Sequence, residues 1–253
     1  MAAMLASSTK TAEAQTVDDI LKKGEVNVGV ILDLPLFGVI NAKGEPEGYD
    51  VDVAKLMEKY LGAKVNFVQL TGPNRIPFLL TNKVDLIIAT FGITPERAKQ
   101  VLFSMPYGAI DNWAFAPDKL KLTSYADLEG LTIGVGRGST QDLLFSANAG
   151  EIAKIMRFDD GPSVYQAMLS GQIDVMGDGK VMAQQYLSTS SNAGIVPQFM
   201  LSRQPNGITM RPDQWNLHRW INTFLYYVKN NGELSTVHEK WFGEPLPKDL
   251  PVF

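Results

Sequence analysis

The chain has 253 residues, of which 45% are hydrophobic and 20% charged, a composition typical of a globular protein with one large domain or two of ordinary size. The net charge is −4 with acidic and basic residues interspersed, which argues against a nucleic-acid partner, because such a partner requires a basic stripe. No segment approaches the roughly 20 consecutive apolar residues needed to cross a bilayer, so we expect no direct membrane insertion.

The sequence contains no cysteine and only two histidines, His218 and His238. Disulfides, thiolate nucleophiles and cysteine-ligated metals are therefore excluded. A histidine-based catalytic triad or zinc site has almost no residues to use. We expect neither a metal nor a cofactor.

Residues 1–24 are rich in small side chains and carry no regular pattern. Ala12-Glu13-Ala14 before Gln15 matches the A-x-A pattern of an export-signal cleavage site, but the apolar core and basic start of a signal peptide are missing. We interpret the segment as a residual signal or a linker, without fixed structure. The first interpretation predicts a protein that works outside the cytoplasm.

The next part of the chain predicts a β-α-β-α-β unit. Its third strand, VDLIIATF, is a continuous apolar run of the kind used in a parallel sheet that is covered on both faces. The predicted elements in order are strand 26–32, helix 49–63, strand 64–70, helix 76–83 and strand 84–91.

A second α/β unit begins near Trp113, and a long helix follows it. The strands of this unit are predicted at 113–117, 131–136, 155–160 and 173–178, and the helices at 124–130, 139–149 and 162–171. The stretch 212–232 carries one apolar helical face and ends in Asn-Asn-Gly, a helix-stop signal. We therefore predict two α/β lobes with a cleft between them, where the carboxyl ends of the strands bind a ligand.

Arg97 follows the end of the strand at 84–91, in the first turn of a predicted helix. Thr94 is a suitable N-cap and Pro95 suits the first helical position, so the helix begins at the cleft. A helix N-terminus attracts an anion, and the Arg97 guanidinium adds a bidentate donor. A solvated surface arginine is the alternative.

The second unit offers similar features at two strand ends. After LTIGVG, Ser139 or Thr140 caps the next helix and forms a second anion-binding terminus, although an ordinary turn would look the same. Asp178 ends the strand at 173–178, where it can hold a cation or cap the helix that follows. Two helix termini with Arg97 favour a carboxylate, and Asp178 favours an ammonium, so together they predict a small zwitterion such as an α-amino acid.

Several stretches resemble the extracytoplasmic amino-acid-binding proteins of ABC importers, solute-binding protein family 3. The segment ITPER and the ending NGEL…KWFG are together highly characteristic of that family. The matching stretches cover nearly all of residues 25–243 and are GYDVDVAKLMEKYLGAKV, NRIPFLLTNKVDLIIATFGITPERAKQVLFSMPY, DLEGLTIGVGRGSTQD, AMLSGQIDVMGD and VKNNGELSTVHEKWFG.

The resemblance implies the type II periplasmic-binding-protein fold, with two lobes joined by two hinge strands and closing over the ligand. Lobe 1 would comprise residues 25–108 plus 206–253, and lobe 2 residues 109–205. It implies a monomeric, soluble periplasmic protein that passes an amino acid to an ABC transporter permease in the inner membrane.

The resemblance also implies roles for individual residues. Arg97 would clamp the ligand carboxylate, assisted by Thr90, Gly92 and Thr140, and Asp178 would hold the α-amino group. The spacing from Asp174 to Asp178 is one residue shorter than usual in the family, which can displace Asp178.

The aromatic residues that sandwich the ligand in many family members are missing here. Leu34 stands at one of these positions, and Gly72-Pro73-Asn74 lies near the other. Phe37, Phe91 and Trp113 are alternative apolar walls, although each type is more often found in a core. Asp33 and Asn74 are candidates for contact with the ligand side chain, with turn roles as the alternative.

Two other functions fit the same fold class. Exported cyclohexadienyl or arogenate dehydratases resemble these proteins and require a general acid in the cleft, for which Asp33 and Asp178 are available. A sensor module is a further alternative, but no transmembrane or kinase segment is attached. We expect a binding protein rather than an enzyme.

Overall fold

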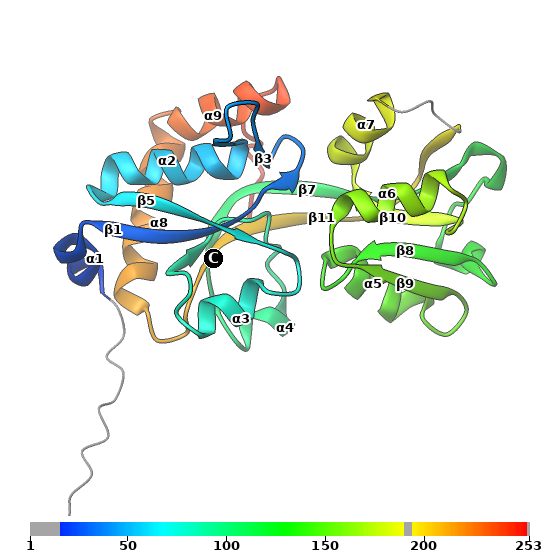
Figure 1. Ribbon diagram of the computed structural model, residues 1–253, viewed down its shortest axis with the longest axis horizontal. Helices are drawn as coiled ribbons and strands as arrows, with labels where there is room; N and C mark the ends of the chain where they lie inside the picture. Colours follow the sequence, from blue (N-terminus) through cyan, green and yellow to red (C-terminus); the bar gives the residue numbers. More distant parts are fainter. Residues whose placement is uncertain (1–15, 190–193, 252–253) are drawn as a thin grey trace, which may run out of the picture.

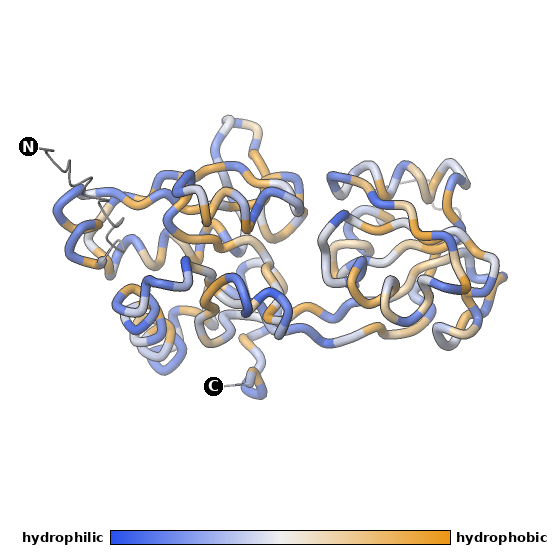
Figure 2. The backbone as a smooth tube through the Cα atoms, turned by 90° about the horizontal axis from the view of Figure 1, so that it is seen from below, coloured by the Kyte–Doolittle hydropathy of each residue, from blue (hydrophilic) through white to orange (hydrophobic). Residues whose placement is uncertain are grey.

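The computed structural model describes residues 16–189 and 194–251. It consists of two α/β lobes that lie side by side and are joined by two long strands, β7 and β11 (Figure 1). The same two bodies and their paired connection are visible from below (Figure 2). The predicted two-lobed α/β fold is therefore confirmed.

The first lobe contains both ends of the described chain. Its helices are α1 (Val17–Lys23), α2 (Tyr49–Leu61), α3 (Arg75–Leu80), α4 (Pro95–Ala98), α8 (Trp215–Asn230) and α9 (Glu233–Phe242). Its strands are β1 (Glu25–Ile31), β2 (Asp33–Leu34), β3 (Gly38–Ile40), β4 (Pro46–Glu47), β5 (Lys64–Leu70) and β6 (Leu86–Ile87).

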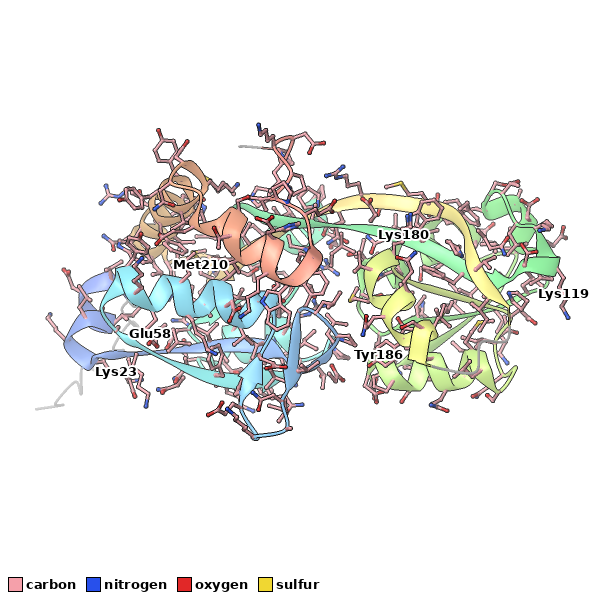
Figure 3. All side chains as sticks on the ribbon, turned by 90° about the horizontal axis from the view of Figure 1, so that it is seen from above. Lys23, Glu58, Lys119, Lys180, Tyr186 and Met210 are labelled. Atoms are coloured by element: carbon pink, nitrogen blue, oxygen red, sulfur yellow. The ribbon has the colours of Figure 1, made fainter. Side chains whose placement is uncertain are left out.

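The second lobe is formed by the central part of the sequence. Its strands are β8 (Thr132–Gly136), β9 (Lys154–Phe158) and β10 (Val175–Gly179), and its helices are α5 (Thr140–Ala149), α6 (Gly161–Leu169) and α7 (Lys180–Thr189). Two 3-10 turns, Asp118–Leu120 and Tyr125–Leu128, precede β8. In the view from above, Tyr186 lies in this lobe and Met210 in the other (Figure 3).

One mixed sheet runs through both lobes in the order β5-β1-β6-β11-β7-β10-β8-β9. Its two central strands, β7 (Leu102–Pro117) and β11 (Ile195–Met210), are antiparallel partners over their whole length. Ala109 pairs with Pro205 midway, and the register shifts shortly afterwards, between Asn206 and Gly207. Proline provides no N–H for the ladder, so the pairing is weaker at the point where the chain passes from one lobe to the other.

Each lobe has its own hydrophobic interior. The prediction for the C-terminal helix is confirmed, because α8 buries the predicted apolar face, with Leu217, Ile221 and Val228 fully inaccessible to solvent. These side chains pack with those of α2 and β1 in one hydrophobic core. This core gives the loops at the edge of the first lobe a rigid support.

Two expectations about elements differ from the structure. Residues 17–23 form a helix inside the segment predicted to lack structure, because Thr16 and Asp19 make a capping box and Ile20 is buried in the core. Residues 1–15, which carry the A-x-A pattern, lie outside the described residues. The strand predicted at 84–91 is only Leu86–Ile87, since the chain leaves extended geometry before Thr90, whose φ is 46°.

Candidate functional site

A cavity of about 120 Å³ lies between the lobes, with the linking strands β7 and β11 contributing to its lining. The charged side chains that line the cavity include basic and acidic groups, and several amide side chains line it as well. The polar lining includes Asp33, Arg75, Thr90, Arg97, Asn112, Ser139, Thr140, Gln141, Asp160, Asp178, Gln204 and Asn206.

Arg97 enters this cavity from α4. Thr94 caps the helix by accepting the Arg97 backbone N–H, and Pro95 occupies the first position, as predicted. The helix is only four residues long, so its dipole adds little and the guanidinium is the main positive charge. The side chain is 7% exposed, and burial lowers its pKa to about 10, so it remains protonated at neutral pH.

The Arg97 guanidinium contacts both lobes. Its Nη1 donates to the Gly92 carbonyl at 2.8 Å and to Thr140 Oγ1 at 3.3 Å, and its Nη2 donates to the Gly138 carbonyl at 2.9 Å. Gly92 belongs to the same lobe as Arg97, whereas Gly138 and Thr140 lie across the cavity. A ligand carboxylate held here would therefore be in contact with both lobes.

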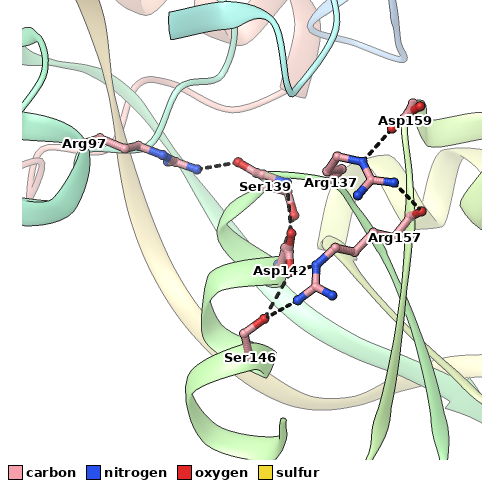
Figure 4. A network of polar contacts seen from close by, with 8 residues as sticks. Arg97, Arg137, Ser139, Asp142, Ser146, Arg157 and Asp159 are labelled. Carbon is pink, nitrogen blue, oxygen red and sulfur yellow. Dashed lines mark hydrogen bonds and ion pairs between the residues drawn. The ribbon is translucent and has the colours of Figure 1, made fainter.

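The facing wall is the loop that begins α5. Ser139 is its N-cap and accepts the Asp142 N–H at 3.1 Å, and Gly138 has a positive φ of 67°. Asp142 also accepts the Gly138 N–H and forms an ion pair with Arg157 at 2.9 Å. These contacts anchor the loop to α5 and β9 (Figure 4). This support fixes the Gly138 carbonyl and the Thr140 hydroxyl in front of Arg97.

Asp178 lines the same cavity from β10. Its carboxylate accepts the Tyr165 hydroxyl and, at 2.7 Å, the backbone N–H of Gly179. Burial raises its pKa to about 6, while these two hydrogen bonds act in the opposite direction. Despite the shortened spacing from Asp174, the side chain lines the cavity.

Asp33 and Leu34 reach the cavity from β2. Burial raises the pKa of Asp33, and the nearby charge of Asp160 adds to this effect. The Asp33 backbone carbonyl accepts the Tyr186 hydroxyl at 3.2 Å, which is a further polar contact between the lobes.

Several predicted site residues do not line the cavity. Phe37 is in the core against Tyr49 and Phe242, and Asn74 accepts the backbone N–H of Thr71 at 2.9 Å in a turn, which are the core and turn roles considered beside ligand contact. Trp113 has Lys180 over its ring and lies outside the lining as well.

Phe91 and Gly92 are not in the lining of the cavity but contact Arg97, which is. Phe91 is 2% exposed and lies beneath the guanidinium of Arg97, with 4.5 Å between Cζ and the ring centroid. Gly92 contributes its carbonyl to Arg97. A Cβ added at Gly92 would lie 0.8 Å from Gln204 Nε2, so a larger residue here would displace the amide of that side chain.

The missing sandwich aromatic has a steric explanation at Gly72. This residue lines the cavity, and a Cβ added to it would lie 2.8 Å from the backbone oxygen of Arg137 in the other lobe. That contact is closer than real Cβ atoms show, so a ring at this position would hold the lobes apart.

Arg75 and four amides were not among the predicted site residues. Arg75 begins α3 directly after a strand and a turn, which is the same signal that identified Arg97. Gln204 and Asn206 are two residues apart on one strand, so they share a face. The amide set is joined by hydrogen bonds from Gln141 to Asn112 at 2.8 Å and from Asn112 to Gln204 at 3.3 Å.

Asn206 leaves one acceptor without a partner. Its residue is 2% exposed, and its Oδ1 has no hydrogen-bond donor among the described residues. Because a buried unpaired acceptor is destabilising, a donor from a bound ligand would be favourable at this point of the cavity.

Residues 16–189 and 194–251 contain no group of three or more His, Cys, Asp or Glu side chains arranged to hold a metal ion. They also contain no helix with the length and apolarity that a membrane crossing requires.

Comparison with known proteins adds an independent line of evidence. ABC transporter arginine-binding protein 1 of Escherichia coli (strain K12) is 32% identical over 248 residues, which cover 96% of this chain and 97% of the relative. A solved mutant of ArgBP from T. maritima matches with a TM-score of 0.83 and 32% identity, covering 90% of this chain and 99% of that one. The ancestral amino acid-binding protein AncCDT-1, described as a precursor of cyclohexadienyl dehydratase, matches with a TM-score of 0.80 and 31% identity over 89% and 98%.

The family comparison spans almost the whole described chain. Residues 26–244 match the family described as bacterial extracellular solute-binding proteins, family 3. The two-lobed fold, the cavity between the lobes and these similarities agree, and the chain belongs to the bacterial extracellular solute-binding proteins of family 3.

Proposed function

We propose that this protein captures an amino acid or a close derivative between its lobes and delivers it to the permease of an ABC importer. The observation that carries the proposal is the presence of Arg97 and Asp178 in one cavity, each with most of its surface removed from solvent. A small dipolar ligand satisfies both charges at once, and transport relatives that bind arginine, glutamine and cystine support the same class.

The ligand's α-carboxylate binds Arg97 and the start of α5, with Ser139 and Thr140 close by. The α-ammonium binds Asp178. Thr90 adds a polar group and Leu34 an apolar surface, and Asp33 lies at the same cavity. Each of these residues lines the cavity, which supports the assignment.

Binding closes the two lobes on each other. We place lobe 1 at residues 25–108 and 206–253, with α1 packed against it through Ile20, and lobe 2 at residues 109–205, so the hinge lies where Ala109 pairs with Pro205. A ligand that contacts both lobes binds the closed form more tightly, and that difference shifts the population toward closure. The protein acts as a monomer in the periplasm, where the permease can recognise the closed form.

An Arg97→Ala variant tests this function. A thermal-shift screen of the wild-type protein against all amino acids and related opines identifies a ligand, because a ligand that binds the native state raises the melting temperature. Calorimetry with that ligand should then give no measurable binding to Arg97→Ala, with far-UV circular dichroism unchanged. Lys99→Ala, which removes a charge that is paired with Glu96 on the exposed surface nearby, serves as the control and should bind normally.

Unchanged affinity in Arg97→Ala would remove this residue from the site. If no amino acid or derivative in the screen stabilises the wild-type protein, the proposed function itself is wrong.

A dehydratase is a second candidate function, favoured by two carboxyl groups in one cavity with raised pKa values, Asp33 and Asp178. Such groups hold a proton closer to neutral pH and can act as general acids. Incubation with prephenate or arogenate and chromatography of the products tests this function. Formation of an aromatic product that Asp178→Asn abolishes would establish the enzyme and displace the transport function.

A further inference from the structure

Arg75 is a second buried arginine at the cavity. It is the first residue of α3 and is 5% exposed. Its three hydrogen bonds all go to backbone carbonyls: Nε donates to Gly72 at 3.1 Å, Nη1 to Ala89 at 3.2 Å and Nη2 to Gly138 at 3.4 Å. These bonds orient the guanidinium, but carbonyl dipoles do not neutralise its charge.

Arg75 and Arg97 both contact the Phe91 ring and the Gly138 carbonyl. Their Cζ atoms lie 4.2 Å and 4.5 Å from the centroid of the Phe91 ring, and both guanidinium groups donate to the carbonyl oxygen of Gly138. Two positive charges are therefore close together in a region from which water is largely excluded.

Among residues 16–189 and 194–251, neither arginine forms an ion pair with a carboxylate. Burial and the charge of Arg97 lower the pKa of Arg75 to about 9, and the attractive contributions on Arg75 come from Tyr107 and Asp50. Asp50 is 1% exposed and its own pKa is raised to about 7, so it supplies only part of a negative charge at neutral pH.

The acidic side chains of the cavity form no ion pair with this pair of arginines. Asp33, Asp160 and Asp178 line the cavity, but within residues 16–189 and 194–251 none of them lies within ion-pair distance of Arg75 or Arg97. Arg137 is different, because it is half exposed and pairs with Asp159 at 2.8 Å.

Buried charges in proteins are normally paired, since an isolated buried charge is strongly unfavourable. The α-carboxylate of an amino acid neutralises one of the two arginines and leaves the other without a counter-charge. Building on the proposed function, we propose that the ligand is an amino acid with a second carboxylate, and that Arg75 binds this group and sets the specificity. A basic amino acid would bring one negative charge for the two arginines and leave the pair uncompensated.

Calorimetry of the wild-type protein with L-glutamate, L-aspartate, L-glutamine, L-asparagine and L-arginine tests the proposal. One or both acids should bind at least about 30-fold more tightly than the corresponding amide, as expected when a buried charge pair replaces a neutral contact. Arg75→Met should remove this preference by weakening acid binding while changing amide binding about threefold or less. Arg75→Lys keeps the charge and should retain part of the preference.

Arg137→Gln is the matched control. It also removes a positive charge from the rim of the cavity, but one that already has Asp159 as its partner, so the ratio of acid to amide affinity should stay the same. The melting temperature of each variant reports whether it folds.

Two results would overturn the proposal while leaving the transport function in place. One is tightest binding of an amide or of arginine by the wild-type protein. The other is an equal loss of acid and amide binding in both Arg75 variants, which would make Arg75 a structural residue. Absence of binding for every amino acid tested would overturn this proposal, and absence of any ligand in the wider thermal-shift screen would overturn the proposed function as well.

Discussion

Asp178 lines the cavity, and its buried environment disfavours the ionised form of its carboxyl group. Its carboxylate has the Tyr165 hydroxyl and the Gly179 N–H as donors, and the Tyr165 ring stacks on Tyr186 at 4.0 Å between centroids. Burial outweighs the two hydrogen bonds and raises the pKa to about 6. The folded protein therefore keeps Asp178 ionised at neutral pH only by a small margin, which makes the residue sensitive to mild acid.

Ligand affinity should depend on pH through Asp178. In the proposed function the ammonium of the ligand binds the ionised carboxylate, so binding should lower the pKa of Asp178, and affinity should be full well above pH 6. Below that value it should fall about tenfold for each pH unit, because each mole of ligand then displaces one mole of protons. Calorimetry between about pH 5 and pH 8 measures this profile.

Tyr165→Phe provides the internal check on this profile. It removes a hydrogen bond that favours the ionised form, so the loss of affinity should begin at a higher pH than in the wild-type protein. A flat profile in both proteins would mean that Asp178 does not contact the ligand ammonium.

At the level of elements, the conformation of the loop after β6 depends on residues from two other elements. Thr90 has a φ of 46°, a conformation that is unfavourable for a side chain with a branched Cβ. Its backbone N–H donates to the Tyr107 hydroxyl of β7 at 3.2 Å, and that hydroxyl donates to Asp50 of α2 at 2.7 Å. Tyr107 thus joins α2, β7 and the loop after β6, and it maintains the conformation of Thr90.

Tyr107→Phe should weaken both stability and binding. The change leaves Asp50 and the Thr90 N–H without their shared partner in a buried region, which should lower the free energy of unfolding by about 1–3 kcal/mol. Chemical denaturation measures this loss. Tyr226→Phe, at a position that is 64% exposed, should change it by less than about 0.5 kcal/mol. A fully stable Tyr107→Phe variant would show that other contacts hold Thr90.

At the level of the whole molecule, polar contacts already bridge the lobes. Arg75 and Arg97 donate across the cavity to Gly138, and the Tyr186 hydroxyl donates to the backbone of Asp33. The covalent connection consists of β7 and β11, whose ladder is irregular near Asn206. When the lobes separate, these polar contacts would have to break, and so would the packing of Met182 of α7 against the first-lobe core.

Small-angle scattering tests this motion. Addition of the ligand found in the thermal-shift screen should reduce the radius of gyration of the wild-type protein, because the closed form is selected. The same concentration should leave the radius of Arg97→Ala unchanged. A ligand that binds tightly without changing the scattering of the wild-type protein would contradict closure as the mechanism of capture.

Most of the fold could be predicted from local sequence patterns. The apolar period of α8, the strand β5 and the caps at Thr94 and Ser139 follow from interactions within a few residues, which a linear pattern contains. The residues at strand ends could be identified in the same way, and Arg97, Asp178, Thr140 and Asp33 do line the cavity.

Other features were decided only by tertiary structure. Phe37 and Phe91 are buried because α9 and the two arginines cover them, and their spacing along the chain does not reveal this. The sequence by itself determined two α/β lobes, since these depend on short-range periodicity and residue type, and it led to the prediction of a ligand with a negative and a positive pole. The convergence of Arg75 and Arg97 on the Gly138 carbonyl depends on how the lobes pack across the cavity, and only long-range contacts could determine it.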